Sequence, residues 1–476
     1  MSTPRSLFIT LPLEMLELIF NHITDPLDFC NASSTCKTLQ SASSRLMKEH
    51  RALAERYQIC TLDLPLGSNS NTTVWALLHD ISNDRRIRNH IRELEIEGGR
   101  QSHYEPSYYE DYEDLVLSID EIRPSRECLD QIRRMDGFQS LPFYTHYLQH
   151  GRDDSFNALL LRQLPNLKAL TYVATGDGAT FLNFIEDAGN MTAPPPYLTK
   201  LETVTFSHWH SECGMDIDWL IAFMRLPSIR IINGHMIKGK AIKSKFSLNK
   251  SNVTTLDFTC SCIEVDFMDK ILEQTQNLKH FSYEHNGALV RDSDWDPHGM
   301  VASLLEHTGH SLEALEISGR EDDDMIEEYC PIRNFKKLKY VSLDHLILVP
   351  SHSEIMNDAN PDGPFSQSLY ENESHELFPP DLDLTNALPP TIEHLEVNKF
   401  LHEDGLPSVG YLLTAKEQGR FPELKKISLH SLLNGRAKIE LWNSLKEIAA
   451  RVDVILEDSA ERKFAKSGKL AEWRYL

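Results

Sequence analysis

Apolar residues recur along most of this chain in one short phrase. An apolar residue is followed by two other residues, a second apolar residue, one more residue and a third apolar residue. The last two apolar positions alternate as on a strand with one buried face, and the first belongs to the turn before that strand. The phrase therefore predicts a series of short strands. Its ten copies begin at Ile91, Leu167, Leu201, Ile229, Val253, Leu278, Leu312, Leu338, Ile392 and Leu424.

The segments between these phrases carry helical patterns. The clearest runs from Lys438 to Val452, where Trp442 and Leu445 belong to an apolar stripe, and it leads into a strand-like run from Val452 to Leu456. A strand, a crossover helix and a parallel strand form the repeating unit of a right-handed α/β solenoid. We therefore predict an α/β fold with parallel strands, and a doubly wound α/β domain is the alternative.

The first fifty residues follow a helical period instead. The apolar residues on one face of the first predicted helix are Leu16, Ile19, Phe20 and Ile23. Pro12 suits the first turn of that helix, Thr24–Pro26 ends it, and Asp25 can cap a second helix. Ser33, Ser34 or Thr35 can cap a third. A unit of about forty residues rarely holds a sufficient core alone. It therefore packs on its own chain or docks on another protein.

This segment resembles an F-box over residues 9–48. It has Leu11-Pro12 with Glu14 two residues further on, Asp25-Pro26 after the first helix, and Cys36-Lys37 as a small residue followed by a basic one. Thr24 and Asn31-Ala32 depart from the family pattern. The resemblance implies binding to the Skp adaptor of a cullin-RING ubiquitin ligase, and through it to cullin. The adaptor-binding residues that it implies are Leu11, Pro12, Leu16, Ile19, Phe20, Leu27, Phe29, Cys36, Lys37 and Leu39.

The ten phrases resemble the degenerate leucine-rich repeats of fungal F-box proteins. Most steps between them are near the ~20–29-residue period of such repeats, although the Asn or Cys that strict repeats place after the strand is missing. The sequences FPELKKISL and LPPTIEHLEV are especially similar to that group. We expect an F-box-like helical domain over residues 1–50 and a helical linker over 51–90. A leucine-rich-repeat-like domain then covers 91–476, with insertions near 100–128 and 350–387.

Composition narrows the classes of partner. Asp and Glu outnumber Lys and Arg by 71 to 48, giving a formal net charge of −23 that disfavours binding to nucleic acid. No apolar run approaches the ~18 residues that indicate a membrane span, so we expect no membrane partner. The first ten residues lack the apolar core of a secretory signal, and eight cysteines are scattered along the chain. A cytoplasmic or nuclear location is therefore expected.

Candidate chemical sites give weak patterns. His208, His210 and Cys213 form one cluster and Cys260 with Cys262 another, but neither has the second pair of ligands that a zinc site needs. The motifs of serine hydrolases, phosphate-binding loops and zinc proteases do not occur. The acidic run 321–328 and the basic run 238–245 are interpreted as exposed charges. We expect no cofactor, no metal and no catalytic activity.

Together the two resemblances imply a substrate-recognition subunit of an SCF-type ubiquitin ligase. The F-box-like helices would dock on the Skp adaptor, and the repeats would hold a protein substrate whose identity the sequence does not reveal. Two alternatives remain. One is a protein-interaction scaffold that uses the same modules without ubiquitin transfer. The other is an α/β enzyme to which the N-terminal helices are an addition.

Overall fold

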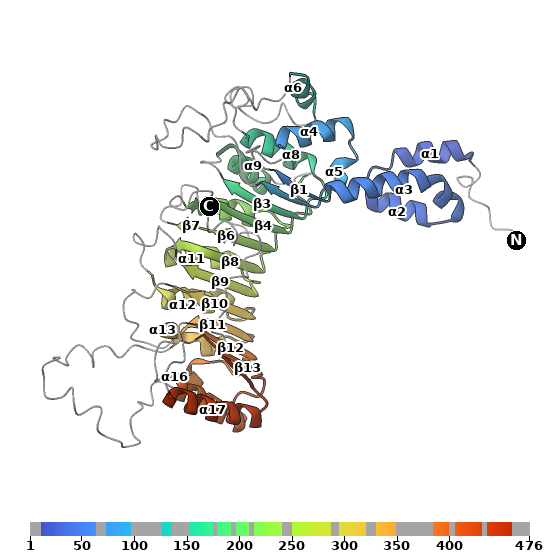
Figure 1. The fold of residues 1–476 in the computed structure, drawn as a ribbon. Helices are drawn as coiled ribbons and strands as arrows, with labels where there is room; N and C mark the ends of the chain where they lie inside the picture. Colours follow the sequence, from blue (N-terminus) through green and yellow to red (C-terminus); the bar gives the residue numbers. More distant parts are fainter. Residues whose placement is uncertain are drawn as a thin grey trace, which may run out of the picture. The chain divides into compact units, whose positions relative to one another are not determined.

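The computed structural model divides into two compact units (Figure 1). Unit 1 comprises Met1–His235 and Lys243–Asn252, and unit 2 comprises Met236–Ile242 and Val253–Leu476. The residues that the structure describes are 11–62, 73–96, 126–135, 153–174, 179–191, 197–208, 214–239, 250–286, 295–319, 330–348, 384–398, 405–430 and 436–458. The acidic run 321–328 and nearly all of the two expected insertions lie outside these residues, as do residues 240–249.

Three helices open unit 1: α1 (Leu13–Asn21), α2 (Pro26–Ser34) and α3 (Lys37–Tyr57). Asp25 caps α2 as predicted, because its side chain accepts hydrogen bonds from the backbone N–H groups of Leu27 and Asp28. The predicted cap of α3 is wrong. Its N-cap residue is Cys36 without a capping side chain, because the hydroxyls of residues 33–35 donate to carbonyls three residues earlier in α2.

The rest of unit 1 contains a parallel sheet with strand order β1-β2-β3-β4-β6. Its strands are β1 (Ile59–Leu62), β2 (Glu93–Ile96), β3 (Ala169–Ala174), β4 (Thr203–His208) and β6 (Ile231–His235), with the short β5 (Met215–Asp216) off this path. Its helices are α4 (Val74–Asn83), α5 (Ile87–His90), α6 (Arg126–Ile132), α8 (Asp154–Gln163), α9 (Ala179–Asn190) and α10 (Asp218–Met224).

The segment 51–90 is not purely helical. Helix α3 continues past residue 50 to Tyr57, and β1 then pairs in parallel with β2. Cys60 and Leu62 of β1 are buried, so they extend the core of the sheet. The sheet therefore begins before residue 91. Tyr57, Cys60 and Leu62 have the spacing of the repeat phrase, but the first two of them are not aliphatic.

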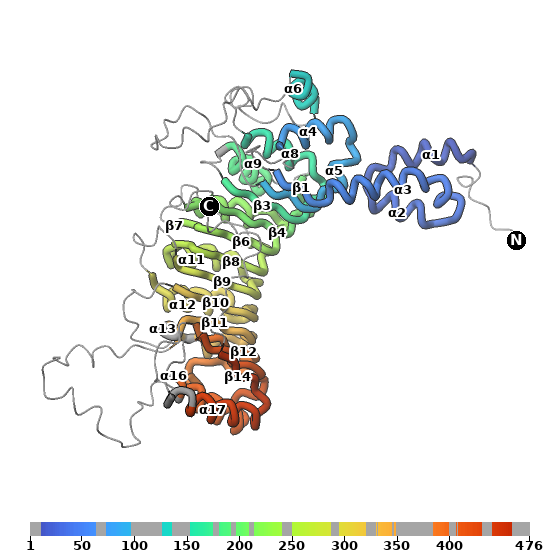
Figure 2. The backbone as a smooth tube through the Cα atoms, viewed as in Figure 1, coloured from blue at the N-terminus to red at the C-terminus, as the bar shows by residue number. Residues whose placement is uncertain are grey.

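Unit 2 has a second parallel array, β8-β9-β10-β11-β12-β13-β14, and β7 (Ile237–Gly239) pairs with β8. Figure 2 follows its backbone from β8, in green, to β14, in red. Its main strands are β8 (Thr255–Ile263), β9 (His280–His285), β10 (Ala314–Ser318), β11 (Tyr340–Asp344), β12 (His394–Asn398), β13 (Lys426–Leu429) and β14 (Ile455–Asp458). Its helices are α11 (Val265–Gln274), α12 (Pro297–Thr308), η5 (Pro331–Asn334), α13 (His345–Leu348), α15 (Leu384–Ala387), α16 (Gly405–Glu417) and α17 (Arg436–Arg451).

All ten phrases form strands, and each strand begins two residues after the first residue of its phrase. Every apolar phrase residue is at most 2% exposed, from Ile91 to Leu429. Within each unit the strand order of the main array follows the chain order, whereas a doubly wound sheet reverses direction at a switch point. The predicted parallel α/β solenoid is thus confirmed.

The last repeat shows a small difference from expectation. Helix α17 spans Arg436–Arg451, close to the predicted range, but the strand after it starts at Ile455 rather than Val452. The chain makes a turn at Asp453, whose φ is +56°. This left-handed residue ends the helix in a common way, and the strand starts only after the turn that it forms.

Candidate protein-interaction surfaces

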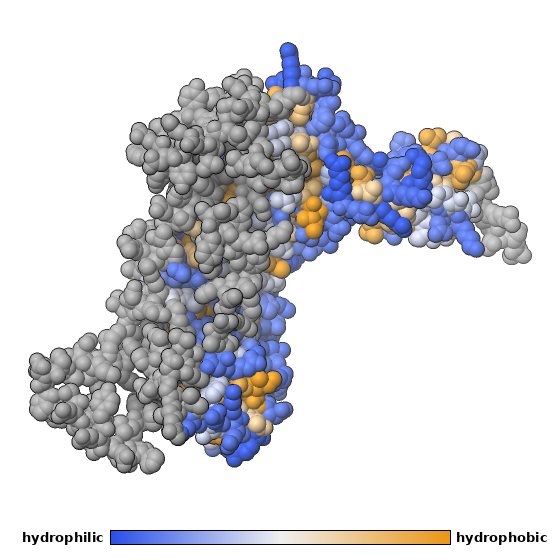
Figure 3. Space-filling view, in the orientation of Figure 1, coloured by the Kyte–Doolittle hydropathy of each residue, from blue (hydrophilic) through white to orange (hydrophobic). Residues whose placement is uncertain are grey.

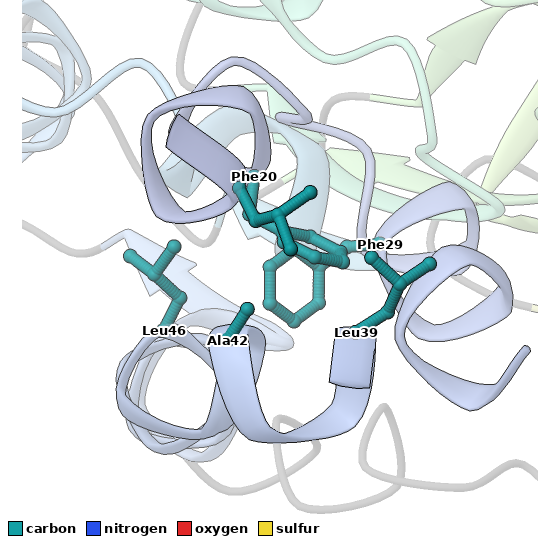
Figure 4. Close-up of a cluster of buried hydrophobic side chains, with 6 residues drawn as sticks. Phe20, Phe29, Leu39, Ala42 and Leu46 are labelled. Atoms are coloured by element: carbon teal, nitrogen blue, oxygen red, sulfur yellow. The ribbon is translucent and has the colours of Figure 1, made fainter. Parts of the chain in front are cut away.

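The three-helix subdomain, residues 11–57, has a core of its own. Helices α1 and α2 both pack on α3. The rings of Phe20 and Phe29 meet edge to face at 5.4 Å. Figure 4 shows these rings among the side chains of α3. The buried residues of this cluster are Leu16, Phe20, Phe29, Leu39, Ala42 and Leu46.

This core contains four of the ten expected adaptor-binding residues. Leu16, Phe20, Phe29 and Leu39 are at most 6% exposed, so their side chains hold the three helices together and present almost no surface to a partner. The sequence could not separate these roles, because a helix with apolar residues on several sides does not reveal which side faces its neighbours.

The other six expected residues are more accessible. Leu11 and Cys36 are partly buried against the core, and Ile19 is also half-buried. Pro12, Leu27 and Lys37 are exposed, and the side chain of Leu27 is 64% exposed. The structure thus leaves Leu27 as the large apolar member of the expected site that is available to a partner.

Three further apolar residues of α1 are exposed, and none of them is among the expected adaptor-binding residues. Leu13, Met15 and Leu18 are 46%, 47% and 55% exposed. Of the nine exposed large apolar side chains within the described ranges, these three and Leu27 lie between residues 13 and 27. We call Leu13, Met15, Leu18 and Leu27 the apolar set. Figure 3 shows apolar surface, in orange, on this subdomain.

Met15 and Leu18 are neighbours on α1, because residues three apart share a helix face. Their direction is nearly opposite to that of Leu16 and Phe20, which enter the core. A second apolar stripe in the sequence of α1 was the signal that could have identified these exposed residues. Exposed apolar residues gathered in this way are typical of a surface that binds another protein.

A hydrogen-bond network joins this subdomain to the first repeats of unit 1. Oδ1 of Asp25 caps α2, while its Oδ2 accepts a hydrogen bond from Nδ2 of Asn166 at 3.1 Å. Asn166 also donates to the carbonyl of Asn89 at 3.0 Å and accepts from Nζ of Lys200 at 2.6 Å. Burial opposes ionisation of Asp25, but these hydrogen bonds and the charge of Lys200 hold its pKa below the ordinary value.

Two buried histidines form a second link at the same junction. Nδ1 of His50 lies 2.9 Å from Nε2 of His90, and the ring of Phe29 packs 4.4 Å from that of His50. Burial, followed by the charge of Arg86, lowers the pKa of His50. Burial, followed by the neighbouring His50, lowers the pKa of His90 to about 4. Both rings are therefore neutral at pH 7, and one donates a hydrogen bond to the other.

The outward faces of the two sheets are a second kind of surface. On each strand, residues between the buried phrase positions point away from the core. In unit 1, equivalent positions carry Glu95, Thr171, Thr205 and Asn233. Thr61 donates to Glu95 at 2.7 Å, and Asn233 donates to Thr205 at 3.0 Å. This face is polar, and its side chains bond to each other across strands.

In the part of the chain that the structure describes, no group of three or more His, Cys, Asp or Glu side chains is arranged to hold a metal ion. His208 ends β4, whereas His210 and Cys213 lie outside the described residues. Cys262 is buried and Cys260 is half-buried. Within the same ranges, no helix combines the length and apolar character needed to cross a membrane.

Parallel strands stacked in chain order, each with the same buried apolar phrase, define a solenoid of leucine-rich type. The family model of a leucine-rich repeat domain matches residues 68–372, which is more than half of the chain. The chain belongs to this leucine-rich repeat family. The match begins after the three-helix subdomain, and no F-box family match was found. No curated protein matches the sequence.

A leucine-rich repeat domain indicates a role in protein–protein interaction. Solenoids of this kind present long, continuous surfaces to their partners, because each repeat contributes the same face of its strand. The structure therefore offers two candidate interaction surfaces: the apolar set of the three-helix subdomain and the outward faces of the sheets.

Proposed function

We propose that the chain is the substrate-recognition subunit of an SCF-type cullin-RING ubiquitin ligase. In this proposal the three-helix subdomain docks on the Skp adaptor, and the repeats hold a protein substrate. One observation carries the proposal: the subdomain has a complete core and still exposes Leu13, Met15, Leu18 and Leu27. The resemblance of residues 9–48 to an F-box gives this surface its partner.

Burial of the apolar set can supply a substantial part of the binding free energy. Full burial of one Leu or Met side chain contributes ~1.5–3 kcal/mol, and the four members of the apolar set are each about half exposed before binding. A standard interface covers ~800 Å² on each partner, and a few central residues supply most of its binding energy. We assign that central role to Met15 and Leu18, with Leu27 beside the start of α2.

The repeats would act by proximity. Holding a substrate near the ubiquitin-loaded carrier of the ligase raises the local concentration of the reactants. This chain then needs no catalytic group of its own. The eight cysteines are scattered along the chain without the spacing of a disulfide framework, which supports placing the protein in the cytoplasm or nucleus. The acidic balance of the chain supports a partner other than nucleic acid.

Calorimetric titration of the full chain with a purified Skp adaptor tests the docking step. The double variant Met15→Asp/Leu18→Asp should weaken binding at least ~100-fold, because two central residues of an interface cost ~2 kcal/mol or more each. The matched control is Tyr411→Asp/Leu441→Asp, which alters two exposed apolar residues of unit 2 and should bind as the unmodified chain does. Unchanged binding by the first variant, or none by the unmodified chain, contradicts the proposal.

A scaffold that binds partners without ubiquitin transfer is the second candidate, since the family match covers residues 68–372 and not the three N-terminal helices. Affinity capture under proteasome inhibition would identify partners of the repeats. Reconstitution with adaptor, cullin and RING subunits then separates the candidates. A receptor should support ubiquitin transfer to the captured partner, and Met15→Asp/Leu18→Asp should abolish it. A scaffold would give capture without transfer.

A further inference from the structure

The turns that precede the strands of the repeats are joined by polar side chains. In five repeats of the described chain, the residue just before the phrase donates a hydrogen bond to a backbone carbonyl of the preceding turn, at 2.7–3.0 Å. We call these residues the turn ladder, and its members are Asn166, Ser228, Asn252, Ser311 and Thr391. Each bond of the ladder ties one repeat to the repeat before it.

At its N-terminal end, the turn ladder continues into the three-helix subdomain. Nδ2 of Asn166 donates to the carbonyl of Asn89 at 3.0 Å and to Oδ2 of Asp25 at 3.1 Å. Asn89 in turn donates from its Nδ2 to the carbonyl of Thr24 at 2.9 Å. Thr24 and Asp25 lie between α1 and α2. The subdomain thus supplies acceptors at this end of the ladder, as a preceding repeat does elsewhere.

The groups at this contact are buried and matched to each other. Asn166 is 1% exposed and Asn89 is 5% exposed. The amide of Asn166 has a partner at both ends, because Nζ of Lys200 donates to its Oδ1 at 2.6 Å. A buried network of this kind favours one arrangement, since a shift of either element leaves a donor or an acceptor unpaired away from water.

The chain also passes from the subdomain into the sheet without a linker. Helix α3 ends at Tyr57, and β1 begins at Ile59. The buried Tyr57 donates to Oδ2 of Asp80 on α4 at 2.8 Å. Arg86, next to the start of α5, donates to Glu49 of α3 at 2.8 Å. Helix α3 is therefore held by two helices of the first repeats as well as by its covalent connection to β1.

We propose that the three-helix subdomain is the N-terminal cap of the repeat array, and that the hydrogen bond between Asp25 and Asn166 couples the cap to the first repeats. A solenoid needs a capping unit at its end, because each repeat is covered only by its neighbours. The subdomain and strands β2 and β3 then open together, as one cooperative unit. This role goes beyond the proposed function, because it holds whether or not the subdomain binds an adaptor.

Hydrogen exchange of the full chain, measured by mass spectrometry at rising urea concentrations below the unfolding midpoint, tests the cooperativity. Peptides from α2 and α3 and peptides from β2 and β3 should lose protection with one shared dependence on urea, because a cooperative unit opens in a single step. If the helices open at clearly lower urea than the strands in the unmodified chain, the proposal of a coupled cap is wrong.

Asn166→Asp tests the coupling bond. It keeps the size of the side chain but places a second carboxylate against Asp25, so exchange in α2 and α3 should become at least ~10-fold faster and the helices should open before the strands. Asn252→Asp is the matched control, since it makes the same change at another position of the turn ladder. It should alter exchange of the helices less than twofold. A urea dependence that helices and strands still share in Asn166→Asp, or equal effects of the two variants, overturns the proposal.

The double variant Asp25→Asn/Asn166→Asp exchanges the donor and the acceptor of this bond. Asparagine caps a helix as well as aspartate does, and its amide can donate to the new carboxylate at position 166. Most of the lost protection and the shared urea dependence should therefore return. A double variant that exchanges as fast as Asn166→Asp would show that the single substitution acted through another contact, and would contradict the assignment to this bond.

The cap also links the apolar set to the first repeats, a consequence that rests on the proposed function. A bound partner stabilises every part of a protein that opens together with its binding site. A saturating Skp adaptor should therefore slow exchange in β2 and β3 as well as in the helices, and in Asn166→Asp it should slow the helices alone. Slowing of the helices alone in the unmodified chain contradicts the coupling. Absence of adaptor binding contradicts the proposed function instead, and the urea experiments then still decide whether the subdomain is the cap.

Discussion

The three-helix subdomain and the repeat sheets use apolar residues in opposite ways. Every apolar phrase residue of the ten repeats is at most 2% exposed, so the repeats place their apolar residues in the core and face outward with polar ones. The subdomain also completes a core, but four large apolar residues remain exposed on α1 and the start of α2. The comparison indicates two kinds of recognition: apolar docking by the subdomain, and polar or charged contacts by the sheets.

The largest effect tests this comparison by replacing a core residue, Phe29, and a surface residue, Leu27, with alanine in separate variants. Phe29 is fully buried and its ring contacts Phe20 and His50, so Phe29→Ala should lower the free energy of unfolding of unit 1 by about 3–5 kcal/mol. Leu27→Ala removes an exposed side chain and should change it by less than about 0.5 kcal/mol. Urea unfolding followed by circular dichroism measures both. Similar losses in the two variants would contradict the assignment of core and surface.

The junction of the subdomain with the first repeats should depend on pH. The pKa values of His50 and His90 are lowered in the folded chain, so the unfolded chain takes up protons first as pH falls. Stability from this pair is present above pH ~6.5 and is lost as pH falls toward about 4, on the order of 3 kcal/mol in total. Free energies of unfolding measured between pH 8 and pH 4 report the slope.

Carboxylates also make stability depend on pH in acid. The control therefore separates their contribution to the slope from that of the histidine pair. His90→Gln removes one titrating ring at the junction and should flatten the slope between pH 6.5 and pH 4. His22→Gln changes an exposed histidine of the same subdomain and should retain the slope. An unchanged slope in His90→Gln would show that the histidine pair does not stabilise the junction.

Asp25 should contribute less than the buried aromatic core. Asp25→Ala removes the cap of α2 and the hydrogen bond from Asn166, so we expect a loss of about 1–3 kcal/mol. Asp28→Ala alters an exposed residue in the first turn of the same helix and should cost less than half as much. Equal losses from the two substitutions, measured by urea unfolding, would mean that the link to Asn166 adds nothing.

The smallest effect is expected at the surface ion pairs of Glu393 in unit 2. Glu393 pairs with Lys339 and Lys425 at the surface, and these partners hold the pKa of Glu393 below its ordinary value. Exposed ion pairs contribute little to stability, so Glu393→Gln should leave the urea midpoint unchanged within error at 50 and 500 mM NaCl. A clear drop at low salt alone would show that the ion pairs of Glu393 stabilise the sheet.

Much of the fold could be predicted because the repeat phrase is a local pattern. Leu312, Leu315 and Ile317 illustrate it: their spacing sets one residue in the turn and two on the buried face of β10. Strand β1 was not predicted, because Tyr57 and Cys60 stand where the other phrases have aliphatic residues. The start of β14 was placed three residues early because the turn at Asp453 depends on backbone conformation, which the apolar pattern does not encode.

The candidate adaptor site was harder to predict for a different reason. Leu16 and Leu18 are both apolar and both helical, and only the position of α3 makes one a core residue and the other a surface residue. Asp25 was identified as a cap, but its hydrogen bond to Asn166 joins positions 141 residues apart in sequence.

Hydrogen–deuterium exchange of the full chain with and without a purified Skp adaptor tests the central claim most directly. The account predicts that the adaptor slows exchange in peptides covering Leu13–Leu27, which hold the whole apolar set, and leaves strands β8 to β13 unchanged. Protection of the strands instead, or no protection between Leu13 and Leu27 at adaptor concentrations that saturate binding, would contradict it.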